Sequence, residues 1–102
     1  MQEKIESLVK IIKKAYPDAT VILFGSRARG DFLKDSDYDL IVVSKAFEGK
    51  QFTDRSTEVL KLLFKEGIVG DFEIPCYTPK EFERKKRMIG IVREALKEGI
   101  IL

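Results

Sequence analysis

Two short apolar runs, separated by a glycine-rich segment and a pair of aspartates, constrain the fold of this chain more than any other feature. The first run, residues 20–24, is β-branched and aromatic with almost no polar side chain. This composition predicts a central strand that is buried on both faces. The second run lies in residues 38–44, directly after the aspartates, and predicts a second strand. A glycine turn therefore ends one strand, and two carboxylates begin another.

Helical periodicity predicts helices on both sides of these strands. Thr53 or Asp54 is the expected cap of the second helix, which is predicted over residues 53–65. The stretch Thr-Pro-Lys-Glu at 78–81 predicts the start of the third, because it combines a capping side chain, a proline in the first turn and an acid near the positive end of the helix dipole. The predicted helices cover residues 2–16, 53–65, 79 to about 87, and 91–98.

Residues 71–77 predict a third strand. Pro75 cannot donate a ladder hydrogen bond, which places this strand at an edge or a bulge of the sheet. The apolar tail, residues 100–102, is expected to pack back on the chain or to meet another chain. Strands and helices together indicate the α/β class, and 102 residues are enough for one small domain, 1–102.

The aspartates are the first candidates for chemistry. Period-two alternation places the side chains of Asp37 and Asp39 on one side of an extended backbone, with Tyr38 on the other. Two carboxylates so placed can share divalent cations, while backbone N–H groups of the segment 25–30 can receive phosphate oxygens. An N-cap and a solvated strand end would also explain the pair. Against this, Asp39 abuts four apolar residues, where a metal would offset the cost of burying a carboxylate.

A third carboxylate is expected from a neighbouring strand, because hard cations take several oxygen ligands. Asp71 and Glu73 have matching parity on the predicted third strand. We favour Glu73, which lies deeper in that strand, and keep Asp71 as the alternative. The chain has no histidine, which excludes His-ligated zinc and Ser-His-Asp catalysis and favours magnesium or manganese.

Other features exclude further classes. After Gly30 come Asp31 and Phe32 where an ATPase-type phosphate loop has Lys and Ser or Thr. The single cysteine, Cys76, excludes an internal disulfide and is expected in the core. The amino terminus has no signal-peptide pattern and no apolar run approaches about 20 residues, so we expect a cytoplasmic protein without a membrane partner. A net charge of +2 gives little support for nucleic-acid binding, and we interpret the basic cluster at 84–87 as a solvated helix face.

The combined motif resembles a known family. Gly-Ser-x-Ala-Arg-Gly at 25–30, a short gap and Ser-Asp-x-Asp-Leu at 36–40 are similar to the signature of the minimal nucleotidyltransferases of the DNA polymerase beta superfamily. The leading helix, the Thr-Pro-Lys-Glu-Phe helix start and the final Lys-Glu-Gly-Ile-Ile-Leu are similar as well. The resemblance implies a mixed sheet flanked by helices, the nucleotidyltransferase fold.

The same resemblance assigns roles to residues. The turn at Gly25 and Ser26 would hold the phosphates of the nucleotide, and Arg29 would offset their charge, whereas Arg27 falls at a variable position. Asp37 and Asp39 would bind two magnesium ions. The third carboxylate would help to activate the attacking hydroxyl; it is usually Asp in the family, and Glu73 is longer by a methylene.

The implied reaction is in-line attack on the α-phosphate of ATP with loss of pyrophosphate. Larger members carry a helical domain that this chain lacks, which implies a partner subunit or a dimer. Minimal members are commonly paired with a HEPN ribonuclease toxin, which they neutralise as antitoxins by transferring AMP to a tyrosine. Two alternatives stay open: an antitoxin that only binds its partner, and the catalytic subunit of a two-chain enzyme that modifies a small molecule such as an aminoglycoside.

Overall fold

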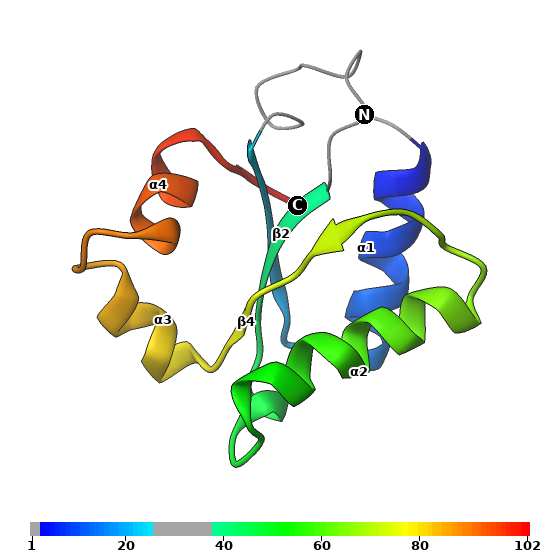
Figure 1. Cartoon of the computed structure of the whole chain (residues 1–102), viewed down its shortest axis with the longest axis horizontal. Coiled ribbons are helices and arrows are strands. Elements are labelled where there is room, and N and C mark those ends of the chain that lie inside the picture. Colours follow the sequence, from blue (N-terminus) through cyan, green and yellow to red (C-terminus); the bar gives the residue numbers. More distant parts are fainter. Residues whose placement is uncertain (1–2, 26–37) are drawn as a thin grey trace.

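The computed structural model describes residues 3–25 and 38–102 (Figure 1). Its four α-helices lie close to the predicted ranges, and the strands predicted over residues 20–24 and 38–44 are present. A single turn of 3-10 helix, η2, follows the second strand. In chain order the elements are α1 (Glu3–Ala15), β1 (Thr20–Phe24), β2 (Tyr38–Val43), η2 (Lys45–Phe47), α2 (Phe52–Lys65), β3 (Phe72–Glu73), β4 (Cys76–Tyr77), α3 (Pro79–Lys85), α4 (Ile91–Glu98) and β5 (Ile100–Ile101).

The strands form one mixed sheet in the order β3-β2-β1-β5, with β4 also paired to β2. β1 is antiparallel to both β2 and β5, whereas β3 and β4 run parallel to β2. The strand predicted over residues 71–77 is therefore divided into two short pieces at the sheet edge. Pro75 lies at the break, where it has no N–H to donate, while its carbonyl oxygen still accepts a hydrogen bond of 3.2 Å from Val42 N.

Helices cover both faces of this sheet (Figure 1). Helices α1 and α2 pack on one face, and α3 and α4 lie on the other. Alternation along β2 sends Leu40 and Val42 into the core beneath α1 and α2, and Ile41 and Val43 into a smaller core beneath α3 and α4. The prediction that β1 is central and buried on both faces is confirmed, because its three middle residues are buried.

Two helix caps differ in how well they were predicted. Thr78 caps α3 as expected, since its side chain accepts from Glu81 N while the Glu81 carboxylate accepts from Thr78 N. The expectation that Thr53 or Asp54 caps α2 is wrong. The helix begins at Phe52 with Gln51 at the cap position, so both residues already lie in its first turn. There the Asp54 carboxylate still complements the helix dipole.

The carboxyl-terminal tail packs back on the chain, one of the two outcomes expected for it. Ile100 and Ile101 form β5 against β1, and Leu102 N donates a hydrogen bond of 2.8 Å to Val21 O. Sequence periodicity could not identify a strand of two residues. No helix within the described ranges 3–25 and 38–102 combines the length and the apolar character needed to cross a bilayer.

Candidate active site

The ends of three strands bring two of the predicted site residues together. Phe24, the last residue of β1, pairs with Asp39 of β2, and Asp39 in turn pairs with Glu73 of β3. Side chains at paired positions project from the same face of a sheet. Because Tyr38 is buried toward α1 and α2, Asp39 and Glu73 belong to the opposite face, the one that α3 and α4 cover. The structure therefore places the Asp39 and Glu73 side chains on neighbouring strands and on one face.

Gly25 is fitted to the Asp39 carboxylate. Its backbone has φ of +76°, a left-handed conformation that favours glycine. A Cβ atom at this position would overlap Asp39 Oδ2 and would lie 3.1 Å from Asp39 Cγ. The sequence predicted Gly25 as part of a phosphate-binding turn. Its close approach to Asp39 is a second requirement for glycine, and no local sequence signal could have indicated that approach.

The short strand that carries Glu73 is held in place by aromatic and cationic contacts. The Phe72 ring stacks on the Tyr38 ring with centroids 5.3 Å apart. Lys4 Nζ lies 5.0 Å from the Tyr38 centroid and 5.6 Å from that of Phe72, and it also donates a hydrogen bond to Val69 O. Sequence reasoning missed Lys4 because it belongs to a helix about seventy residues away. These contacts align β3 with β2 and so fix the position of Glu73.

The alternative third carboxylate, Asp71, lies just before β3. Its carbonyl oxygen accepts a hydrogen bond of 2.9 Å from Tyr38 N, which extends the ladder by one step. The residue paired with Asp39 is nevertheless Glu73. This register agrees with the preference for Glu73, whose role in metal binding and catalysis stays a prediction.

The remaining predicted site residues, Ser26, Arg29 and Asp37, lie outside the described residues, as does Arg27. Within the part of the chain that is described, no three His, Cys, Asp or Glu side chains are grouped closely enough to hold a metal ion. The metal-binding set proposed from the sequence includes Asp37 and is therefore not tested by this observation.

A different charged cluster joins α2, β4 and α3. The Arg55 side chain is only 6% exposed, and its Nη1 and Nη2 donate hydrogen bonds of 2.5 and 3.3 Å to the two carboxylate oxygens of Glu81. Arg55 Nη1 also donates to Cys76 O at 3.2 Å. The Arg55 guanidinium holds the pKa of Glu81 below its usual value. This carboxylate is occupied by a structural ion pair and is not available as a general base.

Cys76 lies in the core, as predicted. Burial raises the pKa of its thiol to about 12, which keeps the sulfur protonated at neutral pH. Burial is also the main cause of the raised pKa of Tyr16, whose hydroxyl donates to Glu58. Neither residue is suited to act as a nucleophile.

A small mixed sheet whose adjacent strand ends present a glycine turn and two carboxylates defines an α/β protein of the nucleotidyltransferase class. Comparison with known proteins agrees with this class. Residues 5–102 match the model of the family described as nucleotidyltransferase domain, and the chain belongs to that family.

Individual relatives support the same assignment. The chain is 32% identical over 103 aligned positions to a Methanocaldococcus jannaschii protein named "Putative protein adenylyltransferase", covering 99% of this chain and 96% of the relative. A Sulfolobus solfataricus crystal structure titled as a putative nucleotidyltransferase is 25% identical with a TM-score of 0.65, and the match covers 97% of this chain and 76% of the other. Another structure with that title is 31% identical with a TM-score of 0.57, covering 84% of this chain and 90% of the other.

Proposed function

We propose that this nucleotidyltransferase transfers AMP from ATP to a tyrosine hydroxyl of a partner protein. The observation that carries the proposal is the register of Asp39 with Glu73, on the strand ends beside Gly25. The name of the Methanocaldococcus jannaschii relative favours a protein acceptor over a small molecule. The partner proposed from the sequence is a HEPN-type toxin, for which this chain would serve as the antitoxin.

The proposed site uses oxygen ligands throughout, which suits magnesium, or manganese in its place. Asp37, Asp39 and Glu73 would hold two such ions. When bound, the ions would supply charge stabilisation for the entering and leaving oxygens. The residue types fit this role, because hard cations take carboxylate oxygens and the chain has no histidine to favour a softer metal.

The transfer step follows from these roles. The tyrosine oxygen forms a bond to the α-phosphorus of ATP, and the bond between that phosphorus and the bridging oxygen breaks, so that pyrophosphate leaves. The phenolic proton passes to Glu73. Gly25 and Ser26 hold the phosphates, and the Arg29 guanidinium offsets their negative charge.

The test is to incubate the chain with ATP, magnesium and its HEPN partner, and to measure the intact mass of the partner. We expect the addition of one or more AMP groups, and no addition when Asp37→Asn and Asp39→Asn are combined. Glu48→Gln, an exposed change beyond the far end of β2, is the matched control and should label normally.

Three results would overturn the proposal. Labelling that persists in the double Asp variant would remove these residues from the site. Neutralisation of the toxin by that variant without any labelling would favour an antitoxin that acts by binding alone. Transfer to an aminoglycoside, with the partner unmodified, would favour the two-chain small-molecule enzyme.

A further inference from the structure

We infer that an apolar groove beside the carboxylates is the docking site for an acidic amphipathic segment of the acceptor protein. This inference rests on the proposed function and deepens it. The groove consists of two adjoining surface hollows of about 560 and 320 Å³. We call it the α3–α4 groove, and its principal lining residues are Phe52, Pro75, Tyr77, Lys85, Met88 and Ile91.

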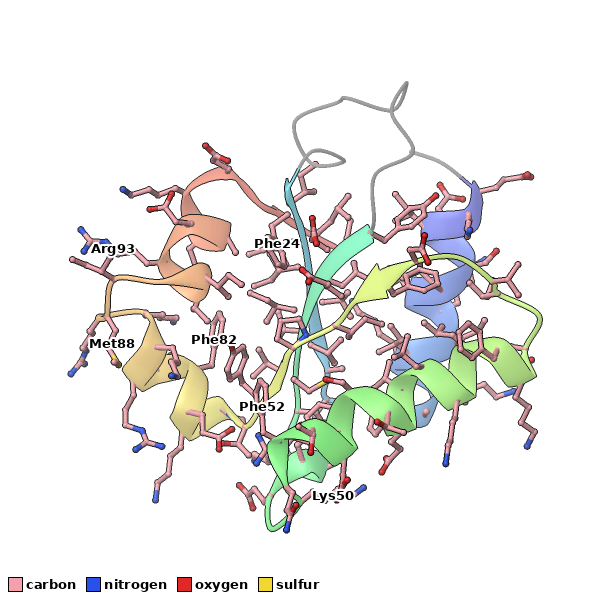
Figure 2. The ribbon with its side chains drawn as sticks, viewed as in Figure 1. Phe24, Lys50, Phe52, Phe82, Met88 and Arg93 are labelled. Atoms are coloured by element: carbon pink, nitrogen blue, oxygen red, sulfur yellow. The ribbon has the colours of Figure 1, made fainter. Side chains whose placement is uncertain are left out.

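The groove exposes more apolar surface than folding requires. Met88 is 54% exposed and Ile89 is 89% exposed, and both lie where α3 gives way to α4. Of the nine large apolar side chains that are exposed among the described residues, four line this groove. Figure 2 shows Phe52 at the start of α2 and Met88 beyond the end of α3. Exposed apolar patches that are surrounded by polar residues mark interaction surfaces.

The charge of the rim indicates the character of the occupant. Arg84 and Lys85 line the groove, and neither has a carboxylate within ion-pair distance among the described residues. The one acid in the lining, Glu81, is already paired with Arg55. The surface therefore presents positive charge next to apolar side chains. A segment with an apolar stripe and acidic flanks would complement both the charge and the apolar character of this surface.

The position of the groove connects it with the candidate active site. Glu73, Pro75 and Tyr77 alternate along the edge of the sheet, so they share the face that carries Asp39. Two residues of extended chain span about 7 Å, which is the approximate separation of Glu73 from the near end of the groove. A segment seated in the groove can therefore present a tyrosine to the carboxylates.

The mode of docking follows from the hydrogen bonds of the edge strand. The outward carbonyls of Ile74 and Cys76 already accept hydrogen bonds from the Ser56 hydroxyl and the Arg55 guanidinium of α2, at 2.8 and 3.2 Å. An added strand would have to displace both bonds. The groove is instead suited to side-chain packing, as when an amphipathic helix places its apolar face in a hydrophobic groove.

The binding test uses two fluorescent 18-residue amphipathic peptides with one tyrosine each. They share the same leucine positions but carry either glutamate or lysine on the polar face. Without ATP, we expect the acidic peptide to bind at least about tenfold more tightly than the basic one, because of the charges on the rim. Amide NMR shifts should map the bound peptide to Tyr77, Lys85, Met88 and Ile91.

Substitutions inside the groove, each compared with a similar substitution outside it, test whether the peptide binds there. Lys85→Glu and Met88→Ser should each weaken binding of the acidic peptide by at least about fivefold, the equivalent of about 1 kcal/mol. Lys61→Glu and Val69→Ser are the controls, since they make the same kinds of change at exposed positions outside the groove and should leave binding unaltered. Equal binding of the two peptides, shifts elsewhere on the surface, or groove variants that bind normally would overturn the inference. So would preferential binding of a 20-nucleotide RNA to the same residues.

The same peptides separate this inference from the proposed function. Asp39→Asn should bind the acidic peptide like the unaltered chain and transfer no AMP to its tyrosine. Groove variants should raise the KM for that peptide while leaving transfer to N-acetyltyrosinamide, which is too short to reach the groove, unchanged. If the groove binds the acidic peptide but no tyrosine accepts AMP, the proposed transfer has failed and the docking surface stands.

Discussion

The two faces of the sheet differ in how much of the core they contain. Beneath α1 and α2, the core contains ten of the twelve largest fully buried side chains in the described part of the chain. Beneath α3 and α4, the buried cluster is small and is built around Ile22 and Ile41. The second face also carries Asp39, Glu73 and the α3–α4 groove.

This division has a physical reason. A carboxylate or an exposed apolar side chain on the second face adds little to folding, so the stability must come from elsewhere. The aliphatic side chains of α1 and the continuous apolar run of β2 supply that stability on the opposite face. On the face of α3 and α4, Asp39 is only half-buried and Glu73 is exposed.

The largest expected effect compares the two cores directly. Leu8→Ala removes a fully buried side chain of α1 and should lower the free energy of unfolding by about 2 to 5 kcal/mol. Val92→Ala in α4 removes two methyl groups from the smaller core and should cost about 1.5 kcal/mol. Urea unfolding followed by circular dichroism measures both. A Val92→Ala loss equal to that of Leu8→Ala would contradict the assignment of stability to one face.

Most of the fold could be predicted from sequence because its main signals are local. The apolar run at 20–24 and the helical stripe that contains Leu8 both determine structure without reference to distant residues. What escaped prediction depends on residues that are far apart in the chain. Examples are the pairing of β5 with β1 and the Arg55–Glu81 ion pair between α2 and α3.

In the candidate site, too, local features could be predicted from the sequence and tertiary contacts could not. Alternation along the second strand correctly placed Asp39 opposite Tyr38 across the sheet. The preference for Glu73 over Asp71 relied on depth in a predicted strand, and only the register with Asp39 gives it a geometric basis. The contact of Gly25 with the Asp39 carboxylate and the contacts of Lys4 with β3 depend on tertiary packing, which periodicity does not encode.

A smaller effect concerns the glycine at the site. Gly25→Ala should lower the free energy of unfolding by about 1 to 2 kcal/mol for its left-handed backbone, with a further loss from overlap with Asp39. Gly67→Ala is the matched control, since Gly67 has φ of +82° but nothing within 4 Å of an added Cβ. We expect AMP transfer to fall in the first variant and to persist in the second. Equal transfer by both would show that the Gly25–Asp39 contact is dispensable.

The smallest expected effect is the dependence of stability on pH, which arises at the end of the sheet away from the carboxylate site. Hydrogen bonds lower the pKa of Asp18, mainly from the Ser44 hydroxyl, and that of Glu58, mainly from Lys50, while Arg55 lowers that of Glu81. A carboxyl group with a lowered folded-state pKa stabilises the fold above its unfolded value of about 4, and loses that contribution as the pH falls through the folded value.

The free energy of unfolding should therefore be level between about pH 7 and pH 5 and should decline below about pH 5, by roughly 1 kcal/mol or less for each group. In Arg55→Met, Glu81 no longer has its cationic partner, so its pKa returns toward the unfolded value and the decline on acidification becomes shallower. Urea unfolding at pH 7 and pH 4 measures the difference for both proteins. An equal decline in the two proteins would mean that the ion pair contributes nothing to acid sensitivity. The loss of stability on acidification would then come from Asp18 and Glu58 alone.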